Sequence, residues 1–288
     1  MKERLGSASA VITLVALSLS TFAYVTTETL PIGLLPEIAK DLDSTVSAVG
    51  LLVTAYGLVV VVSSIPLTRL AQRFPRRRVL MVLLGVFVVG VAVSALAQDY
   101  PTLMIARMVV ALSQALFWAV ITPATAALFR PERRARAISI LFAGSSIAAL
   151  AGVPAGTWLG QLTNWRVAFV ALSGIGLGIL ITIAVLMPNT PAGQSDTDRG
   201  WAPDAGRYWA LVAYTALAVT GAFASFTYIS PFLTDVSGFS ESAVGPVLFV
   251  RGLTGLIGVI IVSYLVSRNG WLTMSGLIVV QTLALAGL

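Results

Sequence analysis

The stretch PEIAKDLDSTVSAVGLLVTAYGL, residues 36–58, returns without a gap as PFLTDVSGFSESAVGPVLFVRGL at residues 231–253. The offset of 195 residues places the run Ser-Ala-Val-Gly on an identical run and pairs Gly57 with Gly252. Six apolar stretches separate the two copies. Because six is an even number of membrane crossings, both copies share one orientation, which predicts a parallel repeat of six-helix halves.

The composition of the chain is that of a membrane protein. Of its 288 residues, 57% are hydrophobic and only 10% are charged, and the mean hydropathy is +0.93. Most apolar runs exceed about 18 residues, enough for a helix to cross the roughly 30 Å hydrocarbon core. The chain has no cysteine and no histidine, which excludes disulfides, thiol nucleophiles and the common zinc sites. No cofactor or metal is expected.

The apolar runs predict nine membrane-spanning helices in an all-α polytopic protein. They lie at residues 10–35, 48–68, 79–98, 101–128, 137–160, 166–187, 208–233, 243–266 and 271–288. We therefore expect an N-terminal six-helix transmembrane bundle at 1–187, a polar cytoplasmic linker at 188–207 and a partial C-terminal bundle at 208–288. A complete second half would run to about residue 390, so three spans are expected to be missing.

Basic residues gather on one side of the predicted membrane. Five arginines lie within residues 69–78 and four within 130–136, in loops on the same side as the N-terminus. Only Lys40 and Arg166 lie in the opposite loops. The positive-inside rule then predicts a multi-pass protein of the cytoplasmic membrane with its N-terminus in the cytoplasm. Since topology accounts for the net charge of +6, we expect contact with membrane lipids and no nucleic-acid partner.

Three ionisable residues are predicted well inside the spans: Glu28, Arg107 and Arg251. An isolated charge at the bilayer centre costs about 2.5–3.5 kcal/mol on insertion scales, so such residues normally face a cavity or a partner. Counting about 1.5 Å per residue from the nearer span end gives each of them a depth of roughly 9–12 Å. They can meet if their helices face one cavity.

Four stretches of the sequence resemble a known family. They are TTETLPIGLLPEIAKDL at 26–42, ALFWAVITPATAALFRPERRARA at 115–137, GVPAGTWLGQLTNWRVAF at 152–169 and FTYISPFLTDVSGFS at 226–240. They are similar to the major facilitator superfamily, to its drug:H+ antiporter-1 group and, within that, to the sugar efflux transporters. The resemblance implies a major facilitator fold, with a complete six-helix N-terminal bundle and about three helices of the second. It also implies proton-coupled efflux of sugars or similar small neutral solutes by alternating access.

The resemblance draws attention to Glu28 and Arg107. The family's first and fourth helices line the central cavity, and its fourth-helix arginine motif matches Leu103, Arg107 and Ala111, with Ala in place of the usual Gly. We expect Glu28 and Arg107 to form a proton-sensitive pair, in which protonation of Glu28 releases Arg107 and shifts the balance between outward and inward states. The alternative is a static buried salt bridge that specifies helix packing.

Helical spacing extends this pair into a surface, because Arg107, Gln114 and Trp118 recur on one helix face. Aromatic, amide and hydroxyl groups suit a polar but uncharged solute such as a sugar. The residues expected to line the substrate cavity are Tyr24, Tyr56, Gln114, Trp118, Thr227, Tyr228 and Arg251. For the aromatic residues the alternative is a role as interfacial anchors.

The loop at residues 68–78 lies where the superfamily has a cytoplasmic gating motif. Gln72 stands in the place of its Asp and Pro75 in the place of its second Gly, so the charge relay through that Asp is not implied here. The basic residues expected to form the gating loop are Arg73, Arg76, Arg77 and Arg78. They can meet lipid phosphate or helix C-termini, or they can serve topology alone.

The fifth predicted span carries a small residue at every fourth position. The series is Gly144, Ala148, Gly152, Gly156 and Gly160, and Pro154 interrupts it where a kink is expected. The family's antiporter motif is also rich in Gly and Pro and lies on its fifth helix, although Val153 stands where the family prefers Gly. The residues expected in a sliding contact for alternating access are Gly144, Gly152, Pro154 and Gly156, with plain helix packing as the alternative.

The leading functional prediction is a proton-coupled exporter whose partners are a small-molecule substrate and protons. Multidrug or antibiotic efflux is the alternative within transport, and a truncated membrane protein that transports nothing is the alternative outside it. An enzyme is least expected, because the few buried polar groups form no nucleophile and base set. The oligomeric state is not specified by the sequence.

Overall fold

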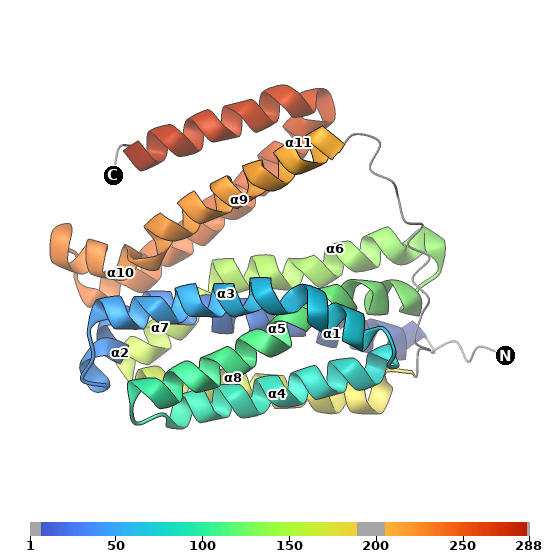
Figure 1. Ribbon diagram of the computed structural model, residues 1–288, viewed down its shortest axis with the longest axis horizontal. Helices are drawn as coiled ribbons and strands as arrows, with labels where there is room; N and C mark the ends of the chain where they lie inside the picture. The colour runs from blue at the N-terminus through green and yellow to red at the C-terminus, as the bar shows by residue number, and fades with distance from the viewer. Residues whose placement is uncertain (1–6, 189–204, 287–288) are drawn as a thin grey trace.

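The computed structural model describes residues 7–188 and 205–286, which are almost entirely helical (Figure 1). The first part contains α1 (Ser7–Gly33), α2 (Leu35–Asp41), α3 (Val46–Ala71), α4 (Arg76–Leu96), α5 (Tyr100–Leu128), α6 (Pro131–Ile147), the π-helix η1 (Ala148–Gly152), α7 (Val153–Leu162) and α8 (Trp165–Leu186). The second part contains α9 (Ala205–Thr227), α10 (Ile229–Pro231), the π-helix η2 (Phe232–Val236) and α11 (Glu241–Ala286). Most of the predicted linker, at 189–204, lies outside the described residues.

Among the described residues, six helical segments are long and apolar enough to cross a membrane, and a bent pair at 208–236 gives a seventh. The six segments coincide with the first six predicted spans, and α6, η1 and α7 together make the fifth, at Pro131–Leu162. The predicted span 243–266 and residues 271–286 of the last predicted span fall within α11, which doubles back on itself (Figure 1). The amide of Gln281 donates to the carbonyl of Ala218 at 2.8 Å, which ties the returning part of α11 to α9. The all-helical membrane fold class is confirmed.

Polar side chains begin several of these helices. Thr45 accepts a hydrogen bond from the backbone N–H of Ala48 at the start of α3, and Asp99 accepts one from Thr102 at the start of α5. Each cap satisfies one of the N–H groups that the first turn of a helix leaves without an intrahelical partner. Short polar connections therefore separate long apolar helices.

The backbone reproduces the internal repeat. α3 and α11 begin at positions related by the offset of 195 residues. The described non-glycine residue with positive φ is Asp43, at 47°, and the described glycine with positive φ is Gly238, at 71°, again 195 residues apart. A left-handed residue is rare outside glycine and marks a tight turn. The two copies of the quoted stretch therefore make the same turn between a short helix and a long one.

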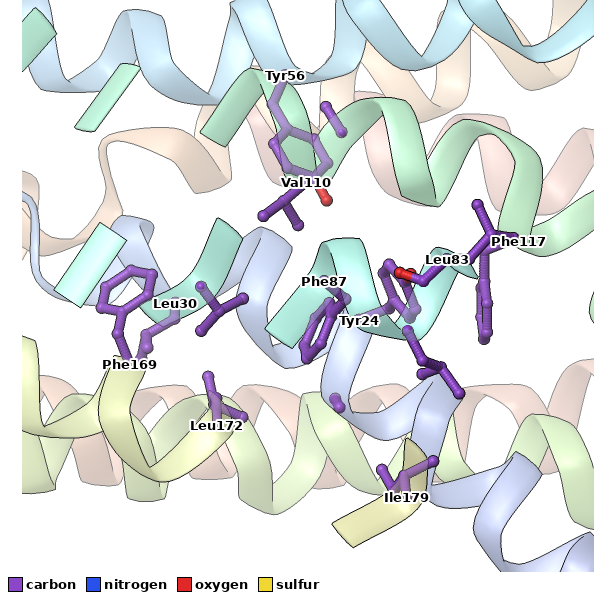
Figure 2. Packing of buried hydrophobic residues seen from close by; sticks show 14 of the residues in the cluster. Tyr24, Leu30, Tyr56, Leu83, Phe87, Val110, Phe117, Phe169, Leu172 and Ile179 are labelled. Carbon is purple, nitrogen blue, oxygen red and sulfur yellow. The ribbon is translucent and has the colours of Figure 1, made fainter. Parts of the chain in front are cut away.

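The aromatic core of the first bundle lies between α1, α4 and α5. The ring of Tyr24 packs against Phe117 and Phe87, with centroid distances of 4.1 and 4.5 Å (Figure 2). Leu30 of α1 and Phe169 and Leu172 of α8 extend the same cluster. Many valines and leucines on the outer faces of the helices are exposed, as hydrocarbon requires of a membrane protein, since lipid tails are as apolar as these side chains.

The small residues of the fifth span lie directly on α1. A Cβ added at Gly144 would collide with the carbonyl of Ser18, and one at Gly152 with the hydroxyl of Thr26. The predicted distortion near Pro154 is a π-helical turn, η1, that ends two residues before it. Because proline has no N–H and its ring crowds the preceding turn, a wider turn accommodates it.

α11 packs against η1 and α7. A Cβ at Gly252 would lie 2.5 Å from the carbonyl oxygen of Ala149 and 2.6 Å from the Cα of Leu150. Two turns earlier on α11, a Cβ added at Gly245 would lie 3.5 Å from the carbonyl oxygen of Pro154 and 3.5 Å from the Cβ of Trp158. We call this contact of α11 with η1 and α7 the seam. It joins the six-helix bundle to the second part of the chain through backbone atoms.

We expect Gly252→Ala to weaken the seam. The added methyl group meets backbone atoms of η1 that cannot rotate away, and overpacking of this kind costs about 1–3 kcal/mol. Gly255→Ala is the matched control on the same helix, because nothing lies within 4 Å of its added Cβ. Thermal unfolding of the purified protein in detergent checks this: a lower melting temperature for Gly252→Ala alone is expected, and equal melting temperatures for both variants would contradict the contact.

Candidate functional site

A proline inside α1 creates the first feature of the site. Pro31 has no N–H, so the carbonyl of Thr27 one turn earlier loses its intrahelical donor. Arg107 of α5 supplies a donor in its place. One terminal guanidinium nitrogen donates to the carbonyl of Thr27 at 2.6 Å, and the second terminal nitrogen donates to the carbonyl of Glu28 at 3.0 Å. Arg107 is completely buried. A buried arginine thus satisfies a carbonyl that proline leaves unpaired, in an environment that offers no water to the backbone.

The carboxylate of Glu28 is held by a different residue. The side-chain amide of Gln114 donates to its Oε2 at 2.6 Å. Over residues 7–188 and 205–286, the salt bridge present is between Asp41 and Arg166, so Glu28 and Arg107 do not form a direct ion pair. The structure brings the two predicted residues together, but through the main chain of α1. Their role in proton coupling stays a prediction.

Tyr56 completes the group from a third helix. Its hydroxyl donates to the Oε1 atom of Gln114 at 2.6 Å, and the guanidinium of Arg107 lies 4.7 Å from the centre of its ring. We call Glu28, Tyr56, Arg107 and Gln114 the Glu28 cluster. Tyr56 and Gln114 are almost completely buried and Glu28 is partly buried. The cluster links α1, α3 and α5 through polar groups inside the bilayer.

Some polar atoms near the cluster have no hydrogen-bond partner within the described ranges. They are the Nε atom of Arg107 and the hydroxyls of Thr26 and Thr27, and all are buried. Unsatisfied buried groups are uncommon and often accompany function. These unpaired groups indicate that this region of α1 and α5 has a functional role besides helix packing.

Other residues predicted for the cavity lie in different surroundings. The side chain of Tyr24 is completely buried, and its hydroxyl contacts the carbonyl of Leu83 at 3.0 Å and the hydroxyl of Ser113 at 3.1 Å, which places it in the core of the first bundle. Trp118 is partly buried and stacks in parallel on Phe142 of α6, with ring centroids 6.0 Å apart. Phe142 was not singled out from the sequence, because a single aromatic residue gives no spacing signal.

The predicted cavity residues of the second part do not contact the Glu28 cluster. Arg251 lies over the ring of Phe226, with 3.7 Å between the guanidinium carbon and the ring centre. Thr227 donates to the carbonyl of Phe223 within its own helix at 2.7 Å. Tyr228 stands at the break between α9 and α10, partly exposed, and a Cβ added at Gly50 would lie 2.6 Å from its hydroxyl.

Two arginines of the predicted gating loop reach neighbouring helices. Arg76 donates to the carbonyl of Pro123 in α5 at 3.1 Å, and Arg77 donates to the carbonyl of Ala184 in the last turn of α8. The C-terminus of α8 carries partial negative charge, so the contact of Arg77 is favourable, whereas Pro123 lies five residues before the end of α5. Arg73 and Arg78 are exposed beside them. The interpretation that the loop meets helix ends fits these contacts, and its gating role stays a prediction.

An ion pair at the opposite end of the bundle was not singled out from the sequence. Arg166 binds Asp41 of α2 and donates to the carbonyl of Ala97 at 2.6 Å. The indole N–H of Trp165 donates to the same carboxylate at 3.1 Å. Arg166 was noted only as one of two basic residues on that side. The group ties α2, α8 and the α4–α5 connection together.

Glu37 of α2 lies near the same end, beyond the membrane-spanning part of α1. Burial raises the pKa of its carboxyl above the usual 4.5, and Glu241 at the start of α11 raises it further, whereas its own main chain and the amide of Gln161 lower it. Asp99 is the opposite case, because hydrogen bonds from Thr102 lower its pKa. The two acids at this end therefore respond to pH with opposite signs.

Comparisons with known proteins now identify the class. The fold is that of a helical membrane protein, and the family description Major Facilitator Superfamily matches residues 17–288. The chain belongs to the major facilitator superfamily. It is 34% identical over 243 residues to a "Probable sugar efflux transporter" of Helicobacter acinonychis, covering 84% of this chain and 62% of that protein. It is 35% identical over 275 residues to the "Uncharacterized MFS-type transporter YtbD" of Bacillus subtilis, covering 94% of this chain and 69% of that protein.

Solved structures agree on the fold. A bacterial homologue of the human lysosomal transporter Spinster, in an inward-facing and unoccupied conformation, matches with a TM-score of 0.73 at 20% identity, covering 91% of this chain and 64% of that one. The nucleoside transporter NupG, as a D323A mutant, matches with a TM-score of 0.68 at 10% identity, covering 90% and 69%. These proteins are transporters, not enzymes. The chain spans about three fifths to two thirds of the length of these relatives and structures.

The raised pKa of Glu37 predicts a pH-dependent stability. A raised pKa means that the folded protein favours the protonated acid, so this contribution is fully present below pH 4.5 and is lost as the pH rises through the raised pKa. We expect Glu37→Gln to melt like the wild type in acid and at a higher temperature than the wild type at neutral pH.

Asp99→Asn is the opposite-sign control, since a lowered pKa stabilises the fold above pH 3.8 and this contribution is lost on acidification. Its melting temperature should fall below that of the wild type at neutral pH and approach it in acid. Unfolding curves of the three proteins measured across this range check both signs. Parallel pH profiles for Glu37→Gln and the wild type would show that Glu37 is not buried as described.

Proposed function

We propose that this protein exports sugars or similar small neutral solutes across the cytoplasmic membrane in exchange for protons, by alternating access. The single observation that carries the proton part is Glu28. It is the only carboxylate that lies well inside the six described spans. An acid kept at such depth normally serves an ion or substrate path, and three helices supply its polar surroundings.

The chemistry of the Glu28 cluster suits reversible protonation. Gln114 donates a hydrogen bond to the carboxylate, and the buried charge of Arg107 attracts it through space. Burial opposes the ionised form, so the balance depends on how much water reaches the cluster. A transporter whose halves open in turn to each side would change that access and therefore the affinity of Glu28 for a proton.

The seam supports alternating access. Gly252 and Gly245 of α11 contact η1 and α7 through backbone atoms and small groups, and Gly144 and Gly152 allow the same segment to lie close to α1. Close contacts between small residues contain few interlocking side chains, so two helices can change their relative position without repacking a core. The residues predicted for the sliding contact lie on α6, η1 and α7. They are Gly144, Gly152, Pro154 and Gly156.

The proposal for the solute rests on the named relatives and on side-chain chemistry. Two of the relatives reported above are a sugar efflux transporter by name and a transporter of the same superfamily. Trp118 and Phe142 offer flat apolar rings, and Thr227 and Tyr228 offer hydroxyls. Rings and hydroxyls together suit sugars, whose ring faces are apolar and whose edges are polar.

We place the N-terminus in the cytoplasm. The connection between α3 and α4 lies at the end of the bundle where α1 begins (Figure 1), and it and the first turn of α4 contain the arginines of the predicted gating loop. The positive-inside rule supports a cytoplasmic location for that end, where the exposed arginines meet anionic lipid headgroups.

We expect Glu28→Gln to abolish pH-driven efflux without impairing membrane insertion. The amide cannot take up or release a proton, so the pH gradient no longer biases the two states. The measurement is sugar flux from proteoliposomes with an imposed pH gradient. Glu132→Gln, at an exposed carboxylate in the first turn of α6, is the control and should keep the wild-type flux.

The same assay contains the results that contradict the proposal. Undiminished coupling in Glu28→Gln would remove Glu28 from the mechanism. Export of a lipophilic cation with no export of any sugar would favour multidrug efflux. An absence of flux for every solute, from a protein that is correctly inserted, would favour a chain that does not transport.

A further inference from the structure

We infer that Gln114, oriented by Tyr56, is a positioning residue that sets the pH at which Glu28 releases its proton. The inference rests on the proposed function only for the role of that proton in transport. The hydrogen-bond geometry itself carries the assignment, which differs from the cavity-lining role predicted for these two residues.

With Glu28 ionised, the amide of Gln114 has one orientation that satisfies both neighbours. A phenol donates its proton readily, and Tyr56 does so to the Oε1 atom of Gln114 at 2.6 Å. This leaves the NH2 group facing the Oε2 atom of Glu28, also at 2.6 Å. A reversed amide would place its oxygen against an ionised carboxylate. Tyr56 favours the same orientation, because its O–H then has the Oε1 atom as acceptor, and Gln114 stabilises the charged form of Glu28.

Arg107 does not make this contact in the described arrangement. Its two terminal nitrogens donate to the carbonyls of Thr27, which Pro31 leaves without an intrahelical donor, and of Glu28. Arg107 and Gln114 are two turns apart on one face of α5. Arg107 binds the backbone of α1, and Gln114 binds the carboxylate of Glu28. Two different side chains of α5 therefore hold the main chain and the acid.

The ionisable surroundings of Glu28 are few. Arg107 from α5 and Tyr56 from α3 face it, and Tyr24 lies one turn away on α1. η1, α7 and α10 contain no ionisable residue, and the charged residues of α6 are in its first two turns. Arg166 of α8 and the acids of α2 lie at the end of the bundle where α1 ends, with Arg166 bound to Asp41. Arg251 of α11 lies against Phe226. Gln114 and Tyr56 are therefore the neutral groups that can tune the titration.

The test measures the protonation of Glu28 directly. Infrared spectra of the purified protein are recorded as a function of pH, and the carboxyl band of Glu28 is assigned by its loss in Glu28→Gln. In Gln114→Leu, which keeps the bulk and removes the donor, the titration midpoint should rise by on the order of one pH unit, a tenfold change in proton affinity. Tyr56→Phe should raise it by less, because the amide keeps its place but loses its fixed orientation.

The double variant decides whether the two residues act in sequence. If Tyr56 acts through Gln114, Tyr56→Phe adds no further shift in the Gln114→Leu background. Tyr24→Phe is the matched control: it also removes a buried tyrosine hydroxyl, but that hydroxyl contacts Leu83 and Ser113 and not Glu28. Its midpoint should equal that of the wild type.

Three results would overturn the inference: an unchanged midpoint in both single variants, a midpoint that falls, or additive shifts in the double variant. A falling midpoint would mean that Arg107 takes over the carboxylate once Gln114 is gone. If Gln114→Leu does not fold, Tyr56→Phe decides alone, because it keeps the ring beside Arg107. The infrared readout needs no transport, so it remains valid even if Glu28→Gln shows that coupling does not use Glu28.

Discussion

The structure depends on one constraint: inside hydrocarbon, every backbone polar group needs a partner from the protein itself. Pro31 leaves the carbonyl of Thr27 without its intrahelical donor, and the guanidinium of Arg107 supplies one, with a second hydrogen bond to the carbonyl of Glu28. A charged residue is costly at this depth. It is retained here with two strong hydrogen bonds, and its position then determines the surroundings of Glu28.

The rest of the site follows from that contact. With Arg107 occupied by the backbone, the carboxylate of Glu28 turns to Gln114, and Tyr56 fixes the amide from α3. Three helices are joined by two short hydrogen bonds and one contact between a cation and an aromatic ring. A change in the charge of Glu28 would alter the contacts among all three helices. This is the physical basis for coupling a proton to a movement of the bundle.

The second part of the chain is attached where side chains are smallest. The fifth span places glycines toward α1, and Gly252 of α11 meets the backbone of η1 from the second bundle. The π-helical turn before Pro154 lies within this seam. Proton site and seam share α1 as a neighbour, because Thr26 contacts Gly152 and the next two residues carry the carbonyls that Arg107 binds. A shift of α1 would therefore reach both.

The sequence by itself determined the membrane class, the first six spans, the family and the internal repeat. These follow from apolar run length, from quoted motifs and from an offset that the positive-φ residues Asp43 and Gly238 reproduce. Charges inside apolar spans also selected Glu28 and Arg107, and helical spacing added Gln114. Only the tertiary structure decided the binding partners of these side chains. Arg107 binds the backbone of α1, Gln114 binds the carboxylate of Glu28, and Tyr24 packs in the aromatic core. Periodicity gives the face of a helix, whereas a hydrogen-bond partner depends on the distance between helices and on competition among donors.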